Sequence, residues 1–212
     1  MKKQQTLVAG LGVAALLGGG ALGVGTSAQA QEQQRTADEV VNGRLLPLNS
    51  SGAYGKAKVD LDGKRAEIRV RANRLAPNLP HAQHIHFGAK ARNECPTAAD
   101  AGRDHRLTTT DGADAYGPVK TSLTTGGDTS PDSTLAVDRF PTAPNGKVRY
   151  QRDITLSSKK LARAIRDGKG VVVIHGVDYN GNGEYDFSSG KSDLDKSLPA
   201  EATDPAVCGV LK

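Results

Sequence analysis

Residues 53–70 read AYGKAKVDLDGKRAEIRV. In both halves of this stretch, small or apolar residues alternate with polar or charged ones, the pattern of a strand with one buried face. The Asp62-Gly63 pair between the halves favours the positive φ angles of a two-residue hairpin turn. The stretch therefore predicts an antiparallel β-hairpin with strands over 53–61 and 65–70.

Short runs of the same kind, separated by turn residues, continue along the chain. Further strands are predicted over 40–48, 81–87, 119–123, 134–137, 147–156 and 170–175. The last of these runs is apolar almost throughout, typical of a strand buried on both faces. One helix is predicted between Ser158, a suitable N-cap, and Gly168, a suitable residue after a helix end. We therefore expect an all-β fold, a Greek-key sandwich or barrel of about eight strands with one short helix.

Two stretches, 88–118 and 176–207, lack periodicity and are rich in Gly, Asp, Ser and Thr. We expect long loops there. Loops of this length inside a compact domain are usually functional or disordered.

The first 30 residues have the features of a secretory signal peptide. Lys2 and Lys3 precede an uncharged run over 7–24, and Ala28-Gln29-Ala30 is a suitable cleavage site. A retained membrane anchor is the alternative, but the run is rich in glycine and the cleavage site follows at once. We expect a protein that is secreted or held in the cell envelope, without membrane contact after cleavage. The expected parts are a signal over 1–30, a flexible arm over 31–38 and one β domain over 39–212.

The composition argues against one class of partner. The chain has 212 residues, a formal net charge of +5, five Tyr, three Phe and no Trp. With few aromatic side chains for base stacking and no stretch dense in Lys and Arg, the sequence does not predict a nucleic-acid partner. The two cysteines, Cys95 and Cys208, can be oxidised outside the cytoplasm, and two free thiols are the alternative.

The histidines have a pattern that suits a metal ion. His84 and His86 lie two residues apart on a predicted strand, so both side chains project from one face. Imidazoles held side by side suit copper, zinc, iron or nickel, although a pair of exposed strand histidines is the alternative. His175 ends the most apolar strand and can reach the face of a neighbouring strand. His81 has odd spacing from His84 and suits a supporting role. His105, in the loop over 88–118, is a candidate fourth ligand or a solvated loop histidine.

A second pattern suggests calcium. Asp178, Asn180, Asn182 and Asp186 place side-chain oxygens at alternating positions around glycines, as in the first half of a calcium loop. The twelfth position holds Ser189 rather than a bidentate Glu. A turn rich in Asn and Gly is the alternative.

These motifs together resemble a known family. The stretch 75–88, LAPNLPHAQHIHFG, resembles the H-x-x-H-x-H strand of copper/zinc superoxide dismutases, and Cys95 follows at the spacing of their first disulfide cysteine. VVVIH at 171–175 is similar to their later V-V-H strand, and CGV at 208–210 to their C-terminal C-G-V. Secreted bacterial proteins with a CHRD domain resemble the chain more closely still.

The resemblance implies copper ligands at His84, His86 and His175, a supporting His81, and a disulfide between Cys95 and Cys208. It implies superoxide, a small anion, as the partner of an active enzyme.

The chain also departs from the family. No zinc site is expected, because Ala101 stands at the position of the metal-bridging histidine and no histidine lies between His105 and His175. Pro205 stands at the position of the arginine that guides the anion, with Glu201 and Asp204 nearby, which would oppose superoxide. The alternative is therefore a non-enzymatic extracellular domain of the same fold that acts in binding or at the cell surface.

Overall fold

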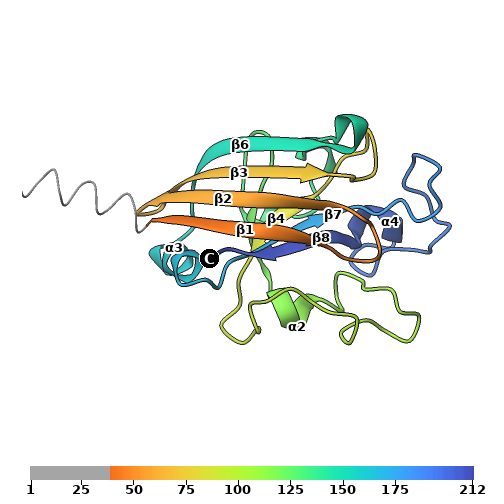
Figure 1. Cartoon of the computed structure of the whole chain (residues 1–212), viewed down its shortest axis with the longest axis horizontal. Coiled ribbons are helices and arrows are strands. Elements are labelled where there is room, and N and C mark those ends of the chain that lie inside the picture. The colour runs from red at the N-terminus through yellow and green to blue at the C-terminus, as the bar shows by residue number, and fades with distance from the viewer. Residues whose placement is uncertain (1–38) are drawn as a thin grey trace, which may run out of the picture. The chain divides into compact units, whose positions relative to one another are not determined.

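The computed structural model describes residues 39–212, so the expected signal and arm lie outside the described residues. Eight antiparallel strands form one curled sheet in the order β5-β4-β7-β8-β1-β2-β3-β6 (Figure 1), which confirms the all-β class. The strands are β1 (Val40–Pro47), β2 (Tyr54–Asp62), β3 (Arg65–Asn73), β4 (Gln83–His86), β5 (Val119–Ser122), β6 (Val148–Thr155), β7 (Val171–His175) and β8 (Pro205–Val210).

The predicted hairpin is present as β2 and β3. Asp62 pairs with Arg65, and Gly63 in the turn has a φ of 59°. The alternating residues of both strands, such as Val59 and Ile68, are buried against the core, while their neighbours face outward.

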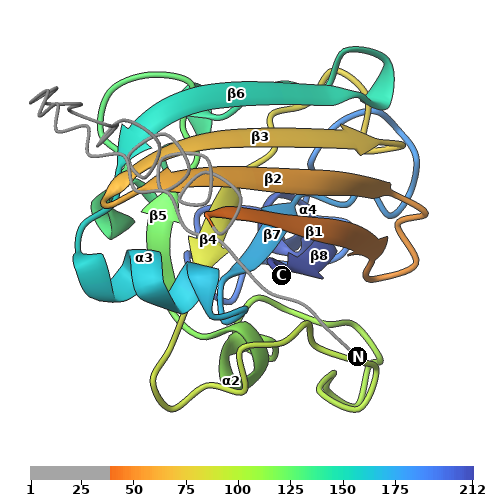
Figure 2. The same cartoon turned by 60° about the vertical axis from the view of Figure 1, so that its left-hand side comes forward.

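The sheet curls at β1, which belongs to both of its halves. Residues 40–45 of β1 pair with β2, and Leu46 and Pro47 pair with β8. Figure 2 shows β4, β7 and β8 behind the layer of β1, β2, β3 and β6. Side chains from both halves, including Ile68 and Ile174, form one apolar core between them.

Two strand assignments differ from the prediction. Residues 134–137 are not a strand, because the chain there passes from one 3-10 turn, η1 (Pro131–Ser133), to another, η2 (Val137–Arg139). Part of the stretch 176–207, expected to be loop, instead begins β8. Five of the six residues of β8 are buried, so this strand lacks the alternation that reveals a half-exposed strand.

The predicted helix is confirmed as α3 (Lys159–Arg166). The Ser158 hydroxyl accepts a hydrogen bond from the Leu161 N–H at 3.1 Å, and Gly168 after the helix has a φ of 74°. Two one-turn helices, α2 (Ala113–Tyr116) and α4 (Ala200–Thr203), lie in the stretches expected to be loops. Within residues 39–212, no helix has the length and apolar character needed to cross a membrane.

The expected disulfide is present. Cys95 and Cys208 are bonded, with a Cα–Cα distance of 5.7 Å. Since Cys208 lies in β8 and Cys95 in the stretch 88–118, the bond attaches that long loop to the sheet.

Candidate metal centre

Three histidines from two neighbouring strands lie on one face of the sheet. His84 in β4 pairs with Val173 in β7, so these two side chains point to the same side. His86 and His175 each lie two residues further along their strands and share that side. Ile85 and Ile174 point the other way, into the main core. The strand period thus separates the apolar core from the histidine cluster.

The cluster is compact and buried. One side-chain nitrogen from each of His84, His86 and His175 lies within 4.8 Å of the other two, and no side chain is more than 3% exposed. Among residues 39–212, no other group of three His, Cys, Asp or Glu side chains is placed in this way.

Each histidine has one ring nitrogen bonded to a backbone carbonyl. His84 Nε2 donates to Thr134 O at 3.1 Å, His86 Nδ1 to Gly117 O at 2.8 Å, and His175 Nδ1 to Thr203 O at 2.6 Å. A carbonyl can only accept, so the bonded nitrogen carries the proton and the second nitrogen keeps its lone pair.

The second nitrogens are the ones that lack a partner. His84 Nδ1, His86 Nε2 and His175 Nε2 are buried and make no hydrogen bond within the described chain. A buried polar atom without a partner costs free energy. A metal ion bound among the three rings would satisfy these lone pairs.

Burial also keeps the cluster neutral. Desolvation lowers the pKa of His86 to about 3 and that of His175 to about 4. Desolvation, together with the neighbouring His175 and His86, holds the pKa of His84 well below its ordinary value. The three imidazoles therefore stay neutral at neutral pH, the form that binds metals.

The cluster opens into a small, apolar cavity of about 30 Å³. Leu135, Val137 and Leu194 line it and are partly exposed, and Thr109 and Thr134 contribute to its wall. Among the described residues that line it, none is Lys, Arg, Asp or Glu. The space suits one or two water-sized groups.

Glu201 and Asp204, expected beside this opening, do not line it. Glu201 is fully buried and accepts hydrogen bonds from the N–H groups of Tyr179 and Asp186. Asp204 is 1% exposed, accepts from the Tyr179 hydroxyl and pairs with Arg106 at 3.2 Å. Both carboxylates are occupied in holding loops and do not line the cavity.

The two remaining histidines lie apart from the cluster. His81 is buried, with Nδ1 2.8 Å from His175 O and Nε2 3.0 Å from Ala76 O, so it contacts the main chain of a cluster residue. His105 is exposed, has a φ of 58° and does not join the cluster. Two residues after His105, the N–H of Leu107 donates a hydrogen bond to Asn49 Oδ1 at 2.8 Å.

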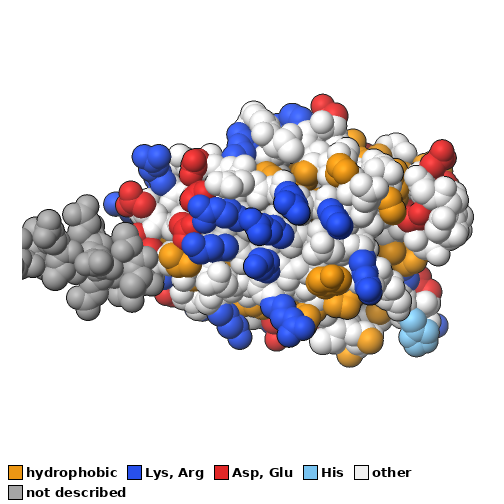
Figure 3. Space-filling view, turned by 45° about the horizontal axis from the view of Figure 1, so that its top comes forward, with side chains coloured by type: hydrophobic (Ala, Val, Ile, Leu, Met, Phe, Trp, Pro, Cys, Tyr) orange, Lys and Arg blue, Asp and Glu red, His pale blue; other side chains and the backbone are white. Residues whose placement is uncertain are grey.

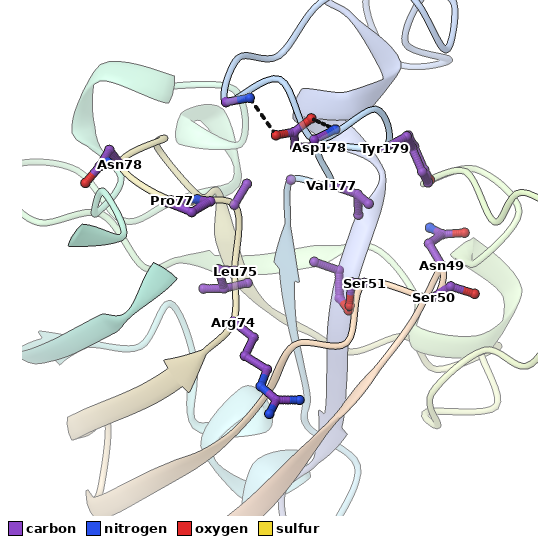
Figure 4. A pocket seen from close by; sticks show the side chains of 15 residues that line it. Asn49, Ser50, Ser51, Arg74, Leu75, Pro77, Asn78, Val177, Asp178 and Tyr179 are labelled. Carbon is purple, nitrogen blue, oxygen red and sulfur yellow. Dashed lines mark hydrogen bonds between the residues drawn. The ribbon is translucent and has the colours of Figure 1, made fainter. Parts of the chain in front are cut away.

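The calcium-like loop has the hydrogen bonds of a turn. Asp178 lines a cavity of about 590 Å³. Figure 4 shows its carboxylate hydrogen-bonded to the backbone of its own loop. The N–H groups of Gly181 and Gly183 donate to it at 2.8 and 2.9 Å. The side-chain amides of Asn180 and Asn182 donate to Asp186. These hydrogen bonds are typical of a turn rich in Asn and Gly, and calcium binding by this loop stays a prediction.

Sequence reasoning missed the groups that orient the cluster. The carbonyls of Thr134, Gly117 and Thr203 are backbone atoms, which leave no side-chain signal. Tyr116 was also missed, although its ring packs on that of His86 with 4.5 Å between centroids.

Comparison with known proteins adds no relative, since no family model and no curated protein matches this chain. The interpretation of the site therefore rests on its own geometry.

Proposed function

We propose that this protein binds a single copper ion through His84 Nδ1, His86 Nε2 and His175 Nε2. The observation that carries the proposal is a group of three buried rings that bring one nitrogen each within 4.8 Å of one another and that each keep one nitrogen without a hydrogen-bond partner. The other nitrogen of each ring donates a hydrogen bond to a backbone carbonyl. Contacts of this kind usually orient histidines that bind metals.

The donor set favours copper among the metals that bind imidazole. Sites of neutral nitrogen donors generally bind Cu²⁺ more tightly than Zn²⁺, Ni²⁺ or Fe²⁺. No carboxylate or thiolate of the described chain joins the three nitrogens. The resemblance of the histidine motifs to those of copper/zinc superoxide dismutases supports the same choice.

We further propose a redox role outside the cytoplasm, following the signal-like residues 1–30. A bound copper ion would supply the one-electron chemistry that superoxide dismutation needs. The protein would hold the ligand rings through the three carbonyls and restrict access to small molecules through the cavity of about 30 Å³.

A second candidate is a copper-containing or metal-free domain without turnover, acting in binding or at the cell surface. The apolar cavity favours it, because no Lys or Arg among the described lining residues would attract an anion.

Copper titration of the purified protein tests the proposal. We expect one copper ion per chain, with binding lost in the His84→Ala/His86→Ala variant and retained in His105→Ala, which removes an exposed histidine outside the cluster. Equal copper binding by all three proteins would refute the assignment. Superoxide consumption by the copper-loaded protein then separates the two candidates, since only the first predicts turnover.

A further inference from the structure

Four cationic side chains form a row across the outer face of β1, β2, β3 and β6. Strand register places Arg44 opposite Lys56, Lys56 opposite Arg71, and Arg71 opposite Arg149. All four are exposed. Neighbouring strands lie about 4.8 Å apart, so the four positions span about 14 Å. We refer to these residues as the basic row.

The basic row has no acidic partner among the described residues. The cations of the adjacent row are neutralised instead: Lys58 pairs with Asp60 at 2.9 Å, and Arg69 pairs with Asp60 at 2.7 Å. None of the ion pairs found within residues 39–212 includes a residue of the basic row. Like charges directly opposite each other destabilise a sheet. The fold therefore carries an electrostatic cost here that an anionic ligand would offset.

The surface beside the basic row is hollowed. A groove of about 470 Å³ is lined by Arg44, Lys56 and Arg71, with Lys58 and Arg69 beside them. Figure 3 shows Lys and Arg side chains gathered on this face. Tyr54, two residues before Lys56 on the same strand, is 49% exposed and adds an aromatic ring to the same face.

An acidic row on the same face limits the shape of the ligand. Asp60 pairs with Glu67, and Glu67 with Asp153, across β2, β3 and β6. These positions lie four residues along the strands from the basic row, about 13 Å away. Asp60 and Glu67 are already paired with Lys58 and Arg69, so, among the described residues of these rows, the unpaired cations are those of the basic row. A narrow anionic chain lying along that row matches them better than a membrane surface or a nucleic-acid duplex that covers both rows.

We propose that the basic row binds a linear acidic polysaccharide, whose sulfate or carboxylate groups pair with the four cations. Single-stranded nucleic acid fits less well, because such sites use several aromatic rings to stack successive bases and this face offers Tyr54 alone among the described aromatic residues. The histidine cluster lies in the other half of the sheet, so this site is independent of the copper proposal.

Polysaccharide binding by the full chain provides the test. Heparin supplies sulfate groups and polygalacturonate supplies carboxylates, and binding of either supports the proposal. The triple variant Lys56→Gln/Arg71→Gln/Arg149→Gln should bind at least ten-fold more weakly, with a smaller dependence of affinity on salt. The matched control is Lys159→Gln/Lys160→Gln/Arg163→Gln, which removes three exposed charges from α3 and should change affinity less than two-fold.

Three outcomes would overturn the proposal. One is no binding of either polysaccharide by the wild-type protein at low salt. A second is equal weakening in both variants, which would mean that net charge alone governs binding. The third is tighter binding of anionic vesicles or single-stranded DNA than of either polysaccharide, lost in the same triple variant. Unchanged copper content and circular dichroism of the variants would show that they fold.

Discussion

His86 Nδ1 donates a hydrogen bond to the carbonyl oxygen of Gly117 at 2.8 Å, across 31 residues of chain. This contact joins a strand of the sheet to the long loop over 88–118. Gly117 has a φ of 80°, and a Cβ added there would lie 2.7 Å from the backbone nitrogen of Gly88. The loop therefore needs glycine at this position to present the carbonyl that orients His86.

Gly117→Ala should weaken copper binding while leaving the three ligands in place. Loss of a contact that orients a metal-binding histidine typically costs about 10- to 100-fold in affinity. Competition titration against a copper chelator measures the change. Gly63→Ala is the control, because it also places alanine at a positive φ, 59°, but no atom lies within 4 Å of the added Cβ. Equal losses in the two variants would show that backbone strain, not the carbonyl contact, is responsible.

The disulfide should support both stability and copper binding. Cys95 and Cys208 are 113 residues apart, and closing a loop of that size stabilises a protein by about 4–5 kcal/mol in the chain-entropy model. Tyr116, beside Gly117 and in contact with the His86 ring at an interplanar angle of 58°, packs with Cys208 and Val173. We expect Cys95→Ala/Cys208→Ala to lower the melting temperature and to weaken copper binding. An unchanged melting temperature, in the variant and in the reduced wild type, would contradict this role.

A strand shows in the sequence when it has either alternation or a continuous apolar run. The hairpin over 53–70 was visible because its outward residues are polar, and the strand over 171–175, buried on both faces, was visible as an apolar run. The strand over 205–210 is also buried on both faces, but Pro205 and Gly209 interrupt it, so it shows neither pattern. Conversely, Leu135 and Val137 alternate like strand residues, but they line the opening of the histidine cavity instead of the core.

The candidate site was predictable only in its side chains. The spacing of His84 and His86 identified a shared face, whereas no pattern of side chains marks the carbonyls that fix the rings. The basic row was hidden for a different reason. Arg44, Lys56, Arg71 and Arg149 are far apart in the sequence, and only strand register brings them into line.

Without metal, the protein should lose stability in acid because of the buried histidines. His86 and His175 have pKa values of about 3 and about 4 in the fold, against about 6.5 when unfolded, and the pKa of His84 is also well below its ordinary value. The unfolded chain thus binds more protons below pH 6.5, and the stability present above that pH falls by about 4 kcal/mol per pH unit as the pH drops toward 4. Urea unfolding at pH 7, 6 and 5 measures the slope. His86→Gln should reduce this slope by about the contribution of one proton. An unaltered slope would contradict the burial of this histidine in its neutral form.

Asp204 should have the opposite effect. Burial raises the pKa of its carboxyl to about 7, although Arg106 and the Tyr179 hydroxyl oppose the shift. The folded chain therefore holds a proton that the unfolded chain releases near pH 4, so the contribution of this group to stability is lost as the pH rises from 4 to 7. The free energy of unfolding of Asp204→Asn, relative to that of the wild type, should therefore rise by about 1.4 kcal/mol per pH unit over this range. Plots of unfolding free energy against pH that run parallel for the two proteins would contradict the raised pKa of Asp204.

A positive charge at the cavity opening should help anions reach a copper ion bound there. Leu135 lines the cavity and is 37% exposed, so the side chain of Leu135→Arg can extend into solvent beside the opening. One charge about 7 Å from a bound anion at the high dielectric of the surface is worth about 0.6 kcal/mol, or roughly three-fold in affinity. We expect azide to bind the copper(II)-loaded variant about three-fold more tightly than the wild type, with the gain disappearing at high salt. Leu46→Arg is the control, because it places the same charge on an exposed leucine outside the cavity lining. An equal gain in the control, or a gain that persists at high salt, would show that the apolar opening does not limit the entry of anions.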